Sequence, residues 1–582
     1  MDNSFGRRSK ARITSLRMGM RDNPWLVVSV VLCLFGLTYN FAGYALLEPD
    51  EGRNAEVARE MAVENDYILP HLNGLPYLDK PILYFATGAA MMEVLGPTVL
   101  AARLPSLLFT LATLTLVGWF GARLFGRRAA WIAVVATASM PFTLAYSRTV
   151  IFDSTLTFFV VLALMGFYLA VDAVTTAEAD ASAGMGWTTL AWAAMAFGVL
   201  TKGPIALAVP LMVVIPFAIW RRSWRAVLDP LSVLVFAALV APWVFAVLRQ
   251  VPDFLHYVVV TETAQRLTTD ELQRTGPIWY FLAILPAAAL PWSIVALGSW
   301  RSLKWRDSHG NMDGRIVYLL LWIVVPLIFF TLSQSKRPQY VLPLVPAIAL
   351  LVAAAWSARP ERLSGLRLAS ATLIVLGVSF VVASRLIPSL VPATASVAPA
   401  IPGTALILGV ACVASGLLPL VSHGRLHMAL MAFAIPVASI PLASQRLMDA
   451  IGRDRSAVEI ARLIESQAGP EARVIGVGVF PLSLPFYLRH TVVLATADGS
   501  ELTSNYITRH YGRFAGQATL RSADWWRTAL IECTSPTVFV IGVEDSQARE
   551  LLRSSVDLLA ETRKYAAYGP CGVTDLAWAG KG

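Results

Sequence analysis

The sequence predicts an α-helical polytopic membrane protein with about 13 transmembrane helices and a carboxyl-terminal α/β domain. Of its 582 residues, 56% are hydrophobic and only 15% are charged, whereas a soluble chain carries about 25% charged residues. So large an apolar surplus cannot be hidden in one globular core and must meet lipid. Residues 446–582 have a different character, because their 15 Lys and Arg balance their 15 Asp and Glu. Disordered, collagen-like and soluble multidomain proteins are therefore excluded.

Thirteen apolar runs are long enough to cross roughly 30 Å of hydrocarbon, which takes about 20 residues. The first follows a basic tail, residues 1–24, and lacks a small-residue cleavage site, so we interpret it as a retained span rather than a signal peptide. We place the runs near residues 25–47, 104–122, 129–146, 153–171, 186–201, 203–220, 230–248, 277–299, 316–334, 340–356, 368–387, 403–421 and 426–444.

The distribution of charge predicts how these spans are oriented. With the amino terminus in the cytoplasm, the inner segments carry 20 basic and 9 acidic residues, whereas the outer loops before residue 446 carry 12 basic and 14 acidic residues. This satisfies the positive-inside rule. The net charge of +9 thus reflects membrane topology and not nucleic-acid binding. An odd number of spans places the last part of the chain outside.

Residues 446–582 form the third predicted domain, after the tail and a transmembrane catalytic domain at 25–445. Segments 456–467 and 546–553 have helical spacing, and segments 473–479 and 537–542 look like short buried strands. No nucleophile elbow, Gly-rich phosphate loop or metal-ligand spacing stands out there, so we expect a structural or acceptor-shaping domain. Of the four cysteines, two lie in apolar runs and rule out a disulfide scaffold, while a bridge between Cys533 and Cys571 remains open.

Candidate functional residues gather in the loops predicted on the outer face. Asp50 and Glu51 follow the first span, where ionised side chains are costly unless they line a wet cavity. Residues 54–64 read as an amphipathic helix lying in the membrane interface. The remaining candidates come from later loops and are Tyr77, Asp79, Lys80, Asp153, Lys202, Glu262, Arg266, Lys336, Arg337 and Tyr340.

Cations that converge from separate loops suit an anionic headgroup, above all a phosphate, and a carboxylate among them suits a base. Three structural alternatives remain open. The cations are scattered anchors that snorkel to the interface, Asp79 and Lys80 form a solvated ion pair, or Asp50 caps a helix that starts near Arg53.

Several of these segments together resemble a known family. The segments are Leu47-Glu48-Pro49-Asp50-Glu51-Gly52-Arg53, Tyr77-Leu78-Asp79-Lys80-Pro81, Thr201-Lys202-Gly203, Glu262-Thr263-Ala264-Gln265-Arg266 and Lys336-Arg337-Pro338-Gln339-Tyr340. In this order they resemble the bacterial aminoarabinose lipid A transferases, which belong with the protein O-mannosyltransferase-like glycosyltransferases of the GT-C fold. The resemblance runs from about residue 25 to 360.

The resemblance implies an inverting glycosyltransferase in the bacterial inner membrane. It would take a sugar, 4-amino-4-deoxy-L-arabinose or another pentose or hexose, from a polyprenyl-phosphate carrier such as undecaprenyl phosphate. Transfer would occur on the periplasmic face, to lipid A or another envelope acceptor, with a glycan or a protein as the alternative.

The resemblance also assigns roles to individual residues. Asp50 matches a catalytic base or acceptor-orienting group, with Glu51 in support, and Lys80 and Arg266 match the cations that bind the carrier phosphate. Tyrosines near that phosphate are matched by Tyr77 and Tyr340, and the other candidates join the substrate-binding set. Asp79 stands where the family usually has a Glu that is metal-linked in some members, so a divalent metal is an open alternative and no other cofactor is implied.

Two functions from other classes compete with this interpretation. Many spans with charged residues also describe a transporter, but here the charges cluster in outer loops and at span ends, and no inverted repeat is visible. An assembly or scaffold protein of the envelope would bind the carrier lipid without turning it over.

Overall fold

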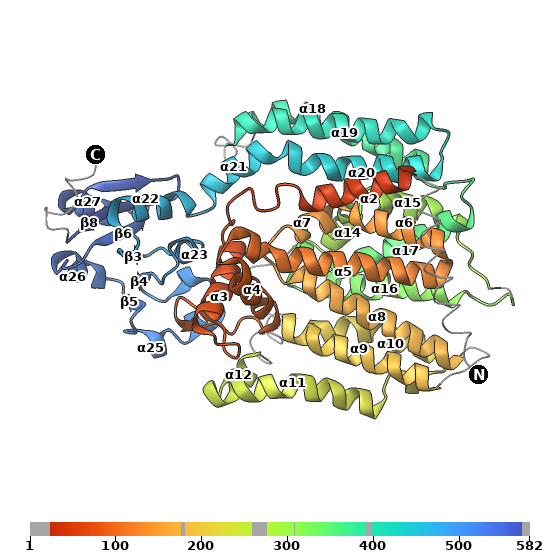
Figure 1. Ribbon diagram of the computed structural model, residues 1–582, viewed down its shortest axis with the longest axis horizontal. Helices are drawn as coiled ribbons and strands as arrows, with labels where there is room; N and C mark the ends of the chain where they lie inside the picture. Colours follow the sequence, from red (N-terminus) through yellow and green to blue (C-terminus); the bar gives the residue numbers. More distant parts are fainter. Residues whose placement is uncertain (1–23, 176–180, 259–275, 308, 391–396, 573–582) are drawn as a thin grey trace.

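The computed structural model describes residues 24–175, 181–258, 276–307, 309–390 and 397–572 (Figure 1). Long helices lie side by side in a bundle, and a smaller α/β unit made from the last part of the chain sits at one end of it. Helices α3 (Asp50–Glu64), α4 (Leu83–Leu95) and α12 (Phe254–His256) lie at the same end. We call this end the outer end.

Nine helical segments in the described ranges are long and apolar enough to cross a membrane. Two bent pairs raise the number to as many as eleven if each pair is one span. The nine contain α5 (Val99–Phe125), α8 (Asp153–Thr175), α9 (Ala181–Lys202), α11 (Pro230–Gln250), α16 (Gly314–Leu332), η4 (Pro338–Leu344) with α17 (Val345–Ala358), α18 (Leu366–Leu390), α19 (Ile401–Val421) and α20 (Leu426–Ala443). The bent pairs are α6 (Arg127–Ala138) with α7 (Pro141–Ser147) and α14 (Tyr280–Ala288) with α15 (Trp292–Ser299).

The described residues thus hold nine to eleven candidate spans, whereas the sequence predicts about thirteen. The predicted spans at 25–47 and 203–220 contain only the shorter apolar helices α2 (Pro24–Thr38) and α10 (Ile205–Trp220), of 15 and 16 residues. At a rise of 1.5 Å per residue these helices are about 22–24 Å long, less than roughly 30 Å of hydrocarbon. The apolar composition continues past Thr38, but the chain leaves the helix there and turns.

Helix α3 differs from the amphipathic interface helix expected at residues 54–64. Its supposedly exposed polar side chains Glu56, Arg59 and Glu60 are all buried. Arg59 forms two hydrogen bonds with Glu56 (2.6 and 2.7 Å), and Glu60 accepts from the backbone N–H groups of the β1 (His71–Leu72) to β2 (Leu75–Pro76) turn. These partners allow the charged face to be buried, because a buried ionised group is tolerated when it is paired.

The α/β unit is a six-stranded sheet in the order β5-β4-β3-β6-β8-β7. The strands are β3 (Arg473–Val477), β4 (Val493–Thr496), β5 (Leu520–Ser522), β6 (Thr537–Gly542), β7 (Leu558–Glu561) and β8 (Tyr565–Cys571). The first four in the sheet order are parallel, and β8 and β7 are antiparallel to their neighbours. Both strands predicted from the sequence, at 473–479 and 537–542, are confirmed as β3 and β6.

The helices of the α/β unit are α21 (Gln445–Asp454), which leads into the unit, α22 (Val458–Ala468), α23 (Leu484–Leu488), α24 (Asn505–Arg509), α25 (Tyr511–Phe514), α26 (Trp525–Ile531) and α27 (Ser546–Ser555).

The outer end of the bundle and the α/β unit share one apolar core. A single cluster of buried side chains runs from Val57 in α3 and Phe85 in α4 to Leu484 in α23 and Val540 in β6. Because apolar burial is the main stabilising term, the α/β unit is docked on α3 and α4 rather than tethered beside them.

A disulfide joins Cys533 to Cys571, so the bridge left open by the sequence is present. The variant Cys533→Ser/Cys571→Ser is expected to lower the free energy of unfolding of the sheet by about 2–4 kcal/mol, the usual effect of losing such a bridge. Hydrogen exchange of the β6 and β8 amides in the full chain measures this. Cys412→Ser, a buried bundle position, is the control that leaves these amides unchanged. Equal protection with and without the bridge would contradict the prediction.

Candidate active site

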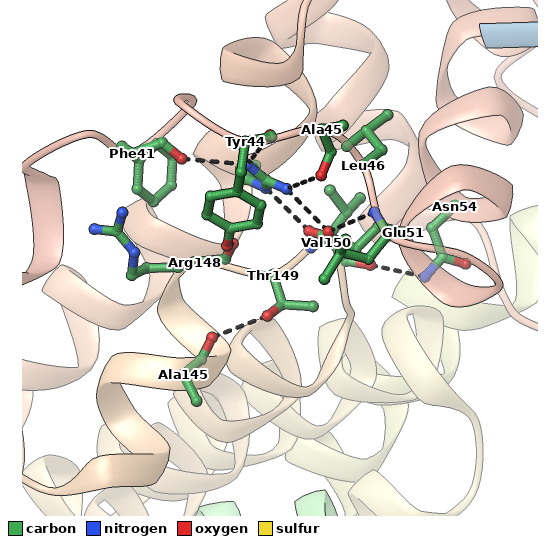
Figure 2. A network of polar contacts seen from close by, with 12 residues as sticks. Phe41, Tyr44, Ala45, Leu46, Glu51, Asn54, Ala145, Arg148, Thr149 and Val150 are labelled. Atoms are coloured by element: carbon green, nitrogen blue, oxygen red, sulfur yellow. Dashed lines mark hydrogen bonds and ion pairs between the residues drawn. The ribbon is translucent and has the colours of Figure 1, made fainter. Parts of the chain in front are cut away.

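A buried ion pair fixes the loop that carries Asp50 and Glu51. The guanidinium of Arg103, in α5, donates from Nε to Oε1 of Glu51 (3.0 Å) and from Nη2 to Oε2 (2.9 Å). Figure 2 shows the surroundings of Glu51, with Tyr44, Ala45 and Val150 close to it. The backbone N–H of Val150 donates to Oε1 (3.0 Å) and that of Leu47 to Oε2 (2.9 Å). Both carboxylate oxygens of Glu51 are engaged with donors, and its side chain is only 4% exposed, so an acceptor cannot reach it and the residue suits a positioning group.

Two arginines also bind the backbone between α2 and α3. Arg103 donates to the carbonyl oxygens of Tyr44 (3.0 Å) and Ala45 (3.1 Å). Arg148 donates to four carbonyls at the end of α2, those of Gly36, Leu37, Tyr39 and Asn40. The last carbonyls of a helix lack partners within it, and Arg148 supplies donors to those at the end of α2. Sequence reasoning overlooked Arg103, although an arginine just inside an apolar run is itself a signal.

Asp50 begins α3 with its side chain a third exposed. Its Oδ1 accepts from Arg53 (2.6 Å), and its Oδ2 lies 3.4 Å from Nη1 of Arg337, which is 287 positions later in the chain. The N-cap position belongs to Pro49 and has no side-chain cap bond. The alternative in which Asp50 caps the helix is therefore wrong, and the structure instead brings Asp50 together with Arg337.

The second group of candidates surrounds a cavity of about 280 Å³. Lys202 forms an ion pair with Asp153, and its Nζ lies 5.2 Å from the centre of the Tyr340 ring. Lys80 Nζ lies 5.9 Å from the centre of the Phe152 ring, which is also 5.3 Å from Lys202 Nζ, and it donates to the carbonyl of Asp79. The cavity is lined by Lys80, Asp153, Lys202, Gln339 and Tyr340 and by apolar residues that include Val209, Val240, Trp243, Phe329 and Phe330.

This cavity has the chemistry of a site for a lipid with an anionic headgroup. Two ammonium groups can neutralise the headgroup, and the apolar wall, built by α10, α11 and α16, can hold a chain of hydrocarbon. Among the residues that the structure describes, none forms a hydrogen bond with the buried Oδ2 of Asp153. Because a buried polar atom of this kind is costly, it is available to accept from a hydroxyl or ammonium group of a bound ligand.

Two other candidates do not line this cavity. Lys336 donates to the carbonyls of Thr331 and Ser333 at the end of α16 (both 2.9 Å), and burial lowers its pKa. Tyr77 is buried with Arg53 6.0 Å from its ring centre. Glu262 and Arg266 lie outside the described residues, so their place in the site stays a prediction.

Asp79 is held by the α/β unit. Its Oδ1 accepts from the Tyr257 hydroxyl (2.6 Å) and the Tyr506 N–H (3.1 Å), and its Oδ2 accepts from the Asn505 N–H (2.9 Å). These partners are donors and do not fit a divalent cation, which needs lone pairs from its ligands. Within the described part of the chain, no group of three or more His, Cys, Asp or Glu residues could hold a metal ion.

Asp50 lines a second cavity, of about 480 Å³, together with Pro141, Ala145, Pro441 and Gln445. Asp50 forms an ion pair with Arg337, and two residues that follow Arg337 in the sequence, Gln339 and Tyr340, line the first cavity. The geometry thus offers two pockets, one lined by Lys80 and Lys202 and the other by Asp50.

Comparisons with known proteins agree with the resemblance that the motifs predicted. Residues 25–258 match the family model of dolichyl-phosphate-mannose-protein mannosyltransferases. The chain is 34% identical over 312 residues to an undecaprenyl phosphate-alpha-4-amino-4-deoxy-L-arabinose arabinosyl transferase of Erwinia tasmaniensis, covering 53% of this chain and 55% of that one. A protein of the same name from Serratia proteamaculans is 33% identical over 336 residues, 57% of this chain and 59% of that one. The chain thus spans little more than half the length of the curated relatives it matches.

A solved structure extends the similarity to nearly the whole chain. The crystal structure of ArnT from Cupriavidus metallidurans bound to undecaprenyl phosphate superposes with a TM-score of 0.81 at 23% identity, over 95% of this chain and 99% of that one. The apo state gives a TM-score of 0.79 at 24% identity. The chain therefore has this polytopic helical fold with its carboxyl-terminal α/β unit, as predicted.

The ion pair between Glu51 and Arg103 predicts a large effect on stability. Glu51→Ala is expected to destabilise the protein by about 3–5 kcal/mol, because it leaves the Arg103 guanidinium buried without its partner. Thermal unfolding of the purified protein in detergent measures the loss. Glu64→Ala, at the half-exposed far end of α3, is the matched control and should change the stability by less than about 0.5 kcal/mol. Equal melting temperatures for the two variants would contradict the assignment of Glu51.

Proposed function

We propose that this chain is a glycosyltransferase that moves 4-amino-4-deoxy-L-arabinose from undecaprenyl phosphate to lipid A. The observation that carries the proposal is the first cavity, in which Lys80 and Lys202 stand at the polar end and apolar side chains form the wall. The sugar and the carrier are those in the names of the similar proteins. Lipid A as the acceptor follows from the resemblance of the motifs, and a glycan or a protein is the alternative acceptor.

The proposed reaction is an inverting displacement at the anomeric carbon. An acceptor oxygen forms a bond to this carbon while the bond to the carrier phosphate oxygen breaks, and the electron pair leaves with the phosphate. Lys80 and Lys202 would neutralise the charge that develops there, and fixed cations do so without reorganisation. The side chain of Asp153 pairs with Lys202 and keeps its ammonium in place.

Asp50 has one of two roles, depending on the acceptor. A hydroxyl acceptor must lose its proton, and a positioned carboxylate can take it. An acceptor phosphate is already ionised and needs only to be oriented. In either case Arg53 and Arg337 hold the carboxylate at the edge of the second cavity, where we place the acceptor.

Two observations support a periplasmic site. The disulfide lies in the α/β unit at the outer end, and disulfides persist in oxidising compartments such as the periplasm. Helix α8 starts at Asp153 in the first cavity, and at its other end Thr175 accepts a hydrogen bond from Arg221 (2.7 Å). Arg221 belongs to a loop with Arg222 and Arg225, and such basic loops stay in the cytoplasm.

Reconstitution tests the reaction and the role of Asp50 together. Proteoliposomes with the purified protein, undecaprenyl phosphate-linked aminoarabinose and lipid A should yield lipid A that carries one more aminopentose, as seen by mass spectrometry. Asp50→Asn keeps the shape of the side chain but not its basicity, so turnover should fall by roughly 10²–10⁴ if it is a general base. Asp524→Asn, whose side chain is 85% exposed on the α/β unit, should keep the normal rate.

Each other outcome has a definite meaning. A near-normal rate for Asp50→Asn would contradict a base at this position and favour an acceptor phosphate. Transfer to a glycan or protein, but not to lipid A, would overturn the proposed acceptor. Carrier that binds and is never consumed would indicate a scaffold protein rather than an enzyme.

Lys80 is expected to contribute to carrier binding. Lys80→Ala should weaken the binding of undecaprenyl phosphate by about 1.5–3 kcal/mol, the usual value of a hydrogen bond to a charged group. Titration of the purified protein with the carrier measures the change in Kd. Lys304→Ala, an exposed lysine near the opposite end of the bundle, is the control, and equal affinities of the two variants would rule out the phosphate contact.

A further inference from the structure

Glu48 is a buried carboxylate in the segment Leu47 to Arg53, and it has no role predicted from the sequence. It precedes Asp50 by two positions, and only 7% of its surface is exposed. The backbone N–H and the hydroxyl of Ser483 donate to its Oε1 (3.0 and 2.7 Å), and the hydroxyl of Tyr565 donates to its Oε2 (3.3 Å). All three donors belong to the α/β unit, although Glu48 belongs to the bundle.

The donors lie near the point where the strand order of the sheet reverses. The chain passes from β3 to β4 and β5 on one side, and then returns to place β6 on the other side of β3. In α/β sheets, ligands bind beyond the carboxyl ends of the strands at the point where the order reverses. Here that point lies between β3 and β6.

Glu48 occupies this point. Ser483 lies in the segment that follows β3, and Tyr565 is paired with Gly542, the last residue of β6. The carboxylate therefore accepts hydrogen bonds from the segment after β3 and from the start of β8, beside the end of β6, at the edge where a separate ligand binds in other sheets of this kind.

The backbone beside Glu48 is held by the same part of the chain. Glu48 N–H donates to the carbonyl of Arg455 (2.8 Å), and Arg455 Nη2 donates to the carbonyl of Glu48 (3.0 Å). On the other side of Asp50, a Cβ atom on Gly52 would lie only 2.7 Å from the backbone nitrogen of Ser483. Only glycine permits this approach, so Asp50 lies between two close contacts with the α/β unit.

We propose that Glu48, a residue of the same chain, takes the ligand position of the α/β unit and acts as a positioning residue that sets the location of Asp50 for sugar transfer. This inference rests on the proposed function. The α/β unit then contributes directly to the site. Its hydrogen bonds to Asp79, the residue before Lys80, position Lys80 for carrier binding in the same way.

Charge on Glu48 is not required for this role. Burial raises the pKa of its carboxyl group, against the opposing effect of the Ser483 and Tyr565 hydrogen bonds. A glutamine can keep all three contacts, because its carbonyl oxygen can accept from Ser483 and its amide can donate to the Tyr565 hydroxyl. An alanine keeps none of them.

The test compares Glu48→Gln and Glu48→Ala in the full chain, reconstituted with the carrier-linked sugar and lipid A. Glu48→Ala should lower kcat by about tenfold to hundredfold, the effect of a small misplacement of a reacting group, while the KM for the carrier changes by less than about twofold. Glu48→Gln should remain within about threefold of the normal kcat. Glu465→Ala, an exposed glutamate of α22, controls for loss of a negative charge from the outer surface.

A second variant separates positioning from general damage. In the Asp50→Asn background, Glu48→Ala should cause no further fall in kcat, because residues that act as a unit are not additive. A full additional loss would contradict action through Asp50, as would a normal kcat for Glu48→Ala.

Hydrogen exchange of the Ser483 amide tests the contact without any activity. Exchange should be at least about tenfold faster in Glu48→Ala than in the unmodified chain or in Glu48→Gln. If the unmodified protein transfers no sugar, the proposed function fails, and this measurement still decides whether Glu48 is the ligand of the crevice. Equal exchange in all three proteins would overturn the inference.

Discussion

The buried ion pair between Glu51 and Arg103 is the interaction on which the rest of the site depends. It joins the start of α3 to α5, and through the N–H of Val150 it also joins α3 to the segment before α8. Removing two charges from water is costly, and only multiple hydrogen bonds make such a pair tolerable. Those bonds leave the loop around Asp50 little freedom, which is what a reacting carboxylate needs.

The bundle alone does not complete this arrangement. Glu48 and Asp79, which stand beside the proposed base and the proposed phosphate ligand, both accept hydrogen bonds from the α/β unit. The α/β unit also covers the charged face of α3, where Arg59 donates to the carbonyl of Arg489 (3.1 Å). In the neighbouring turn between β1 and β2, Asn73 forms two hydrogen bonds with the backbone of Val492. The unit expected from the sequence to be structural or to shape the acceptor is thus in direct contact with the candidate site.

Much of this could be predicted from the sequence. The apolar runs located the helices of the bundle, because burial in lipid leaves an unmistakable composition, and the motifs brought Lys80, Lys202 and Tyr340 to one site. Where a helix ends within an apolar run could not be predicted, since composition did not show that the chain turns after Thr38. Nor could the partners of Glu51 and Asp79, because each contact joins segments far apart in the chain and depends on how the outer end packs.

A structure of the protein with undecaprenyl phosphate bound tests the central claim most directly. We expect the phosphate within hydrogen-bond distance of Lys80 or Lys202, the lipid chain between α10, α11 and α16, and Asp50 on the side of the phosphate that faces the second cavity. A phosphate bound instead among Pro141, Pro441 and Gln445, in the cavity that we assign to the acceptor, would contradict it.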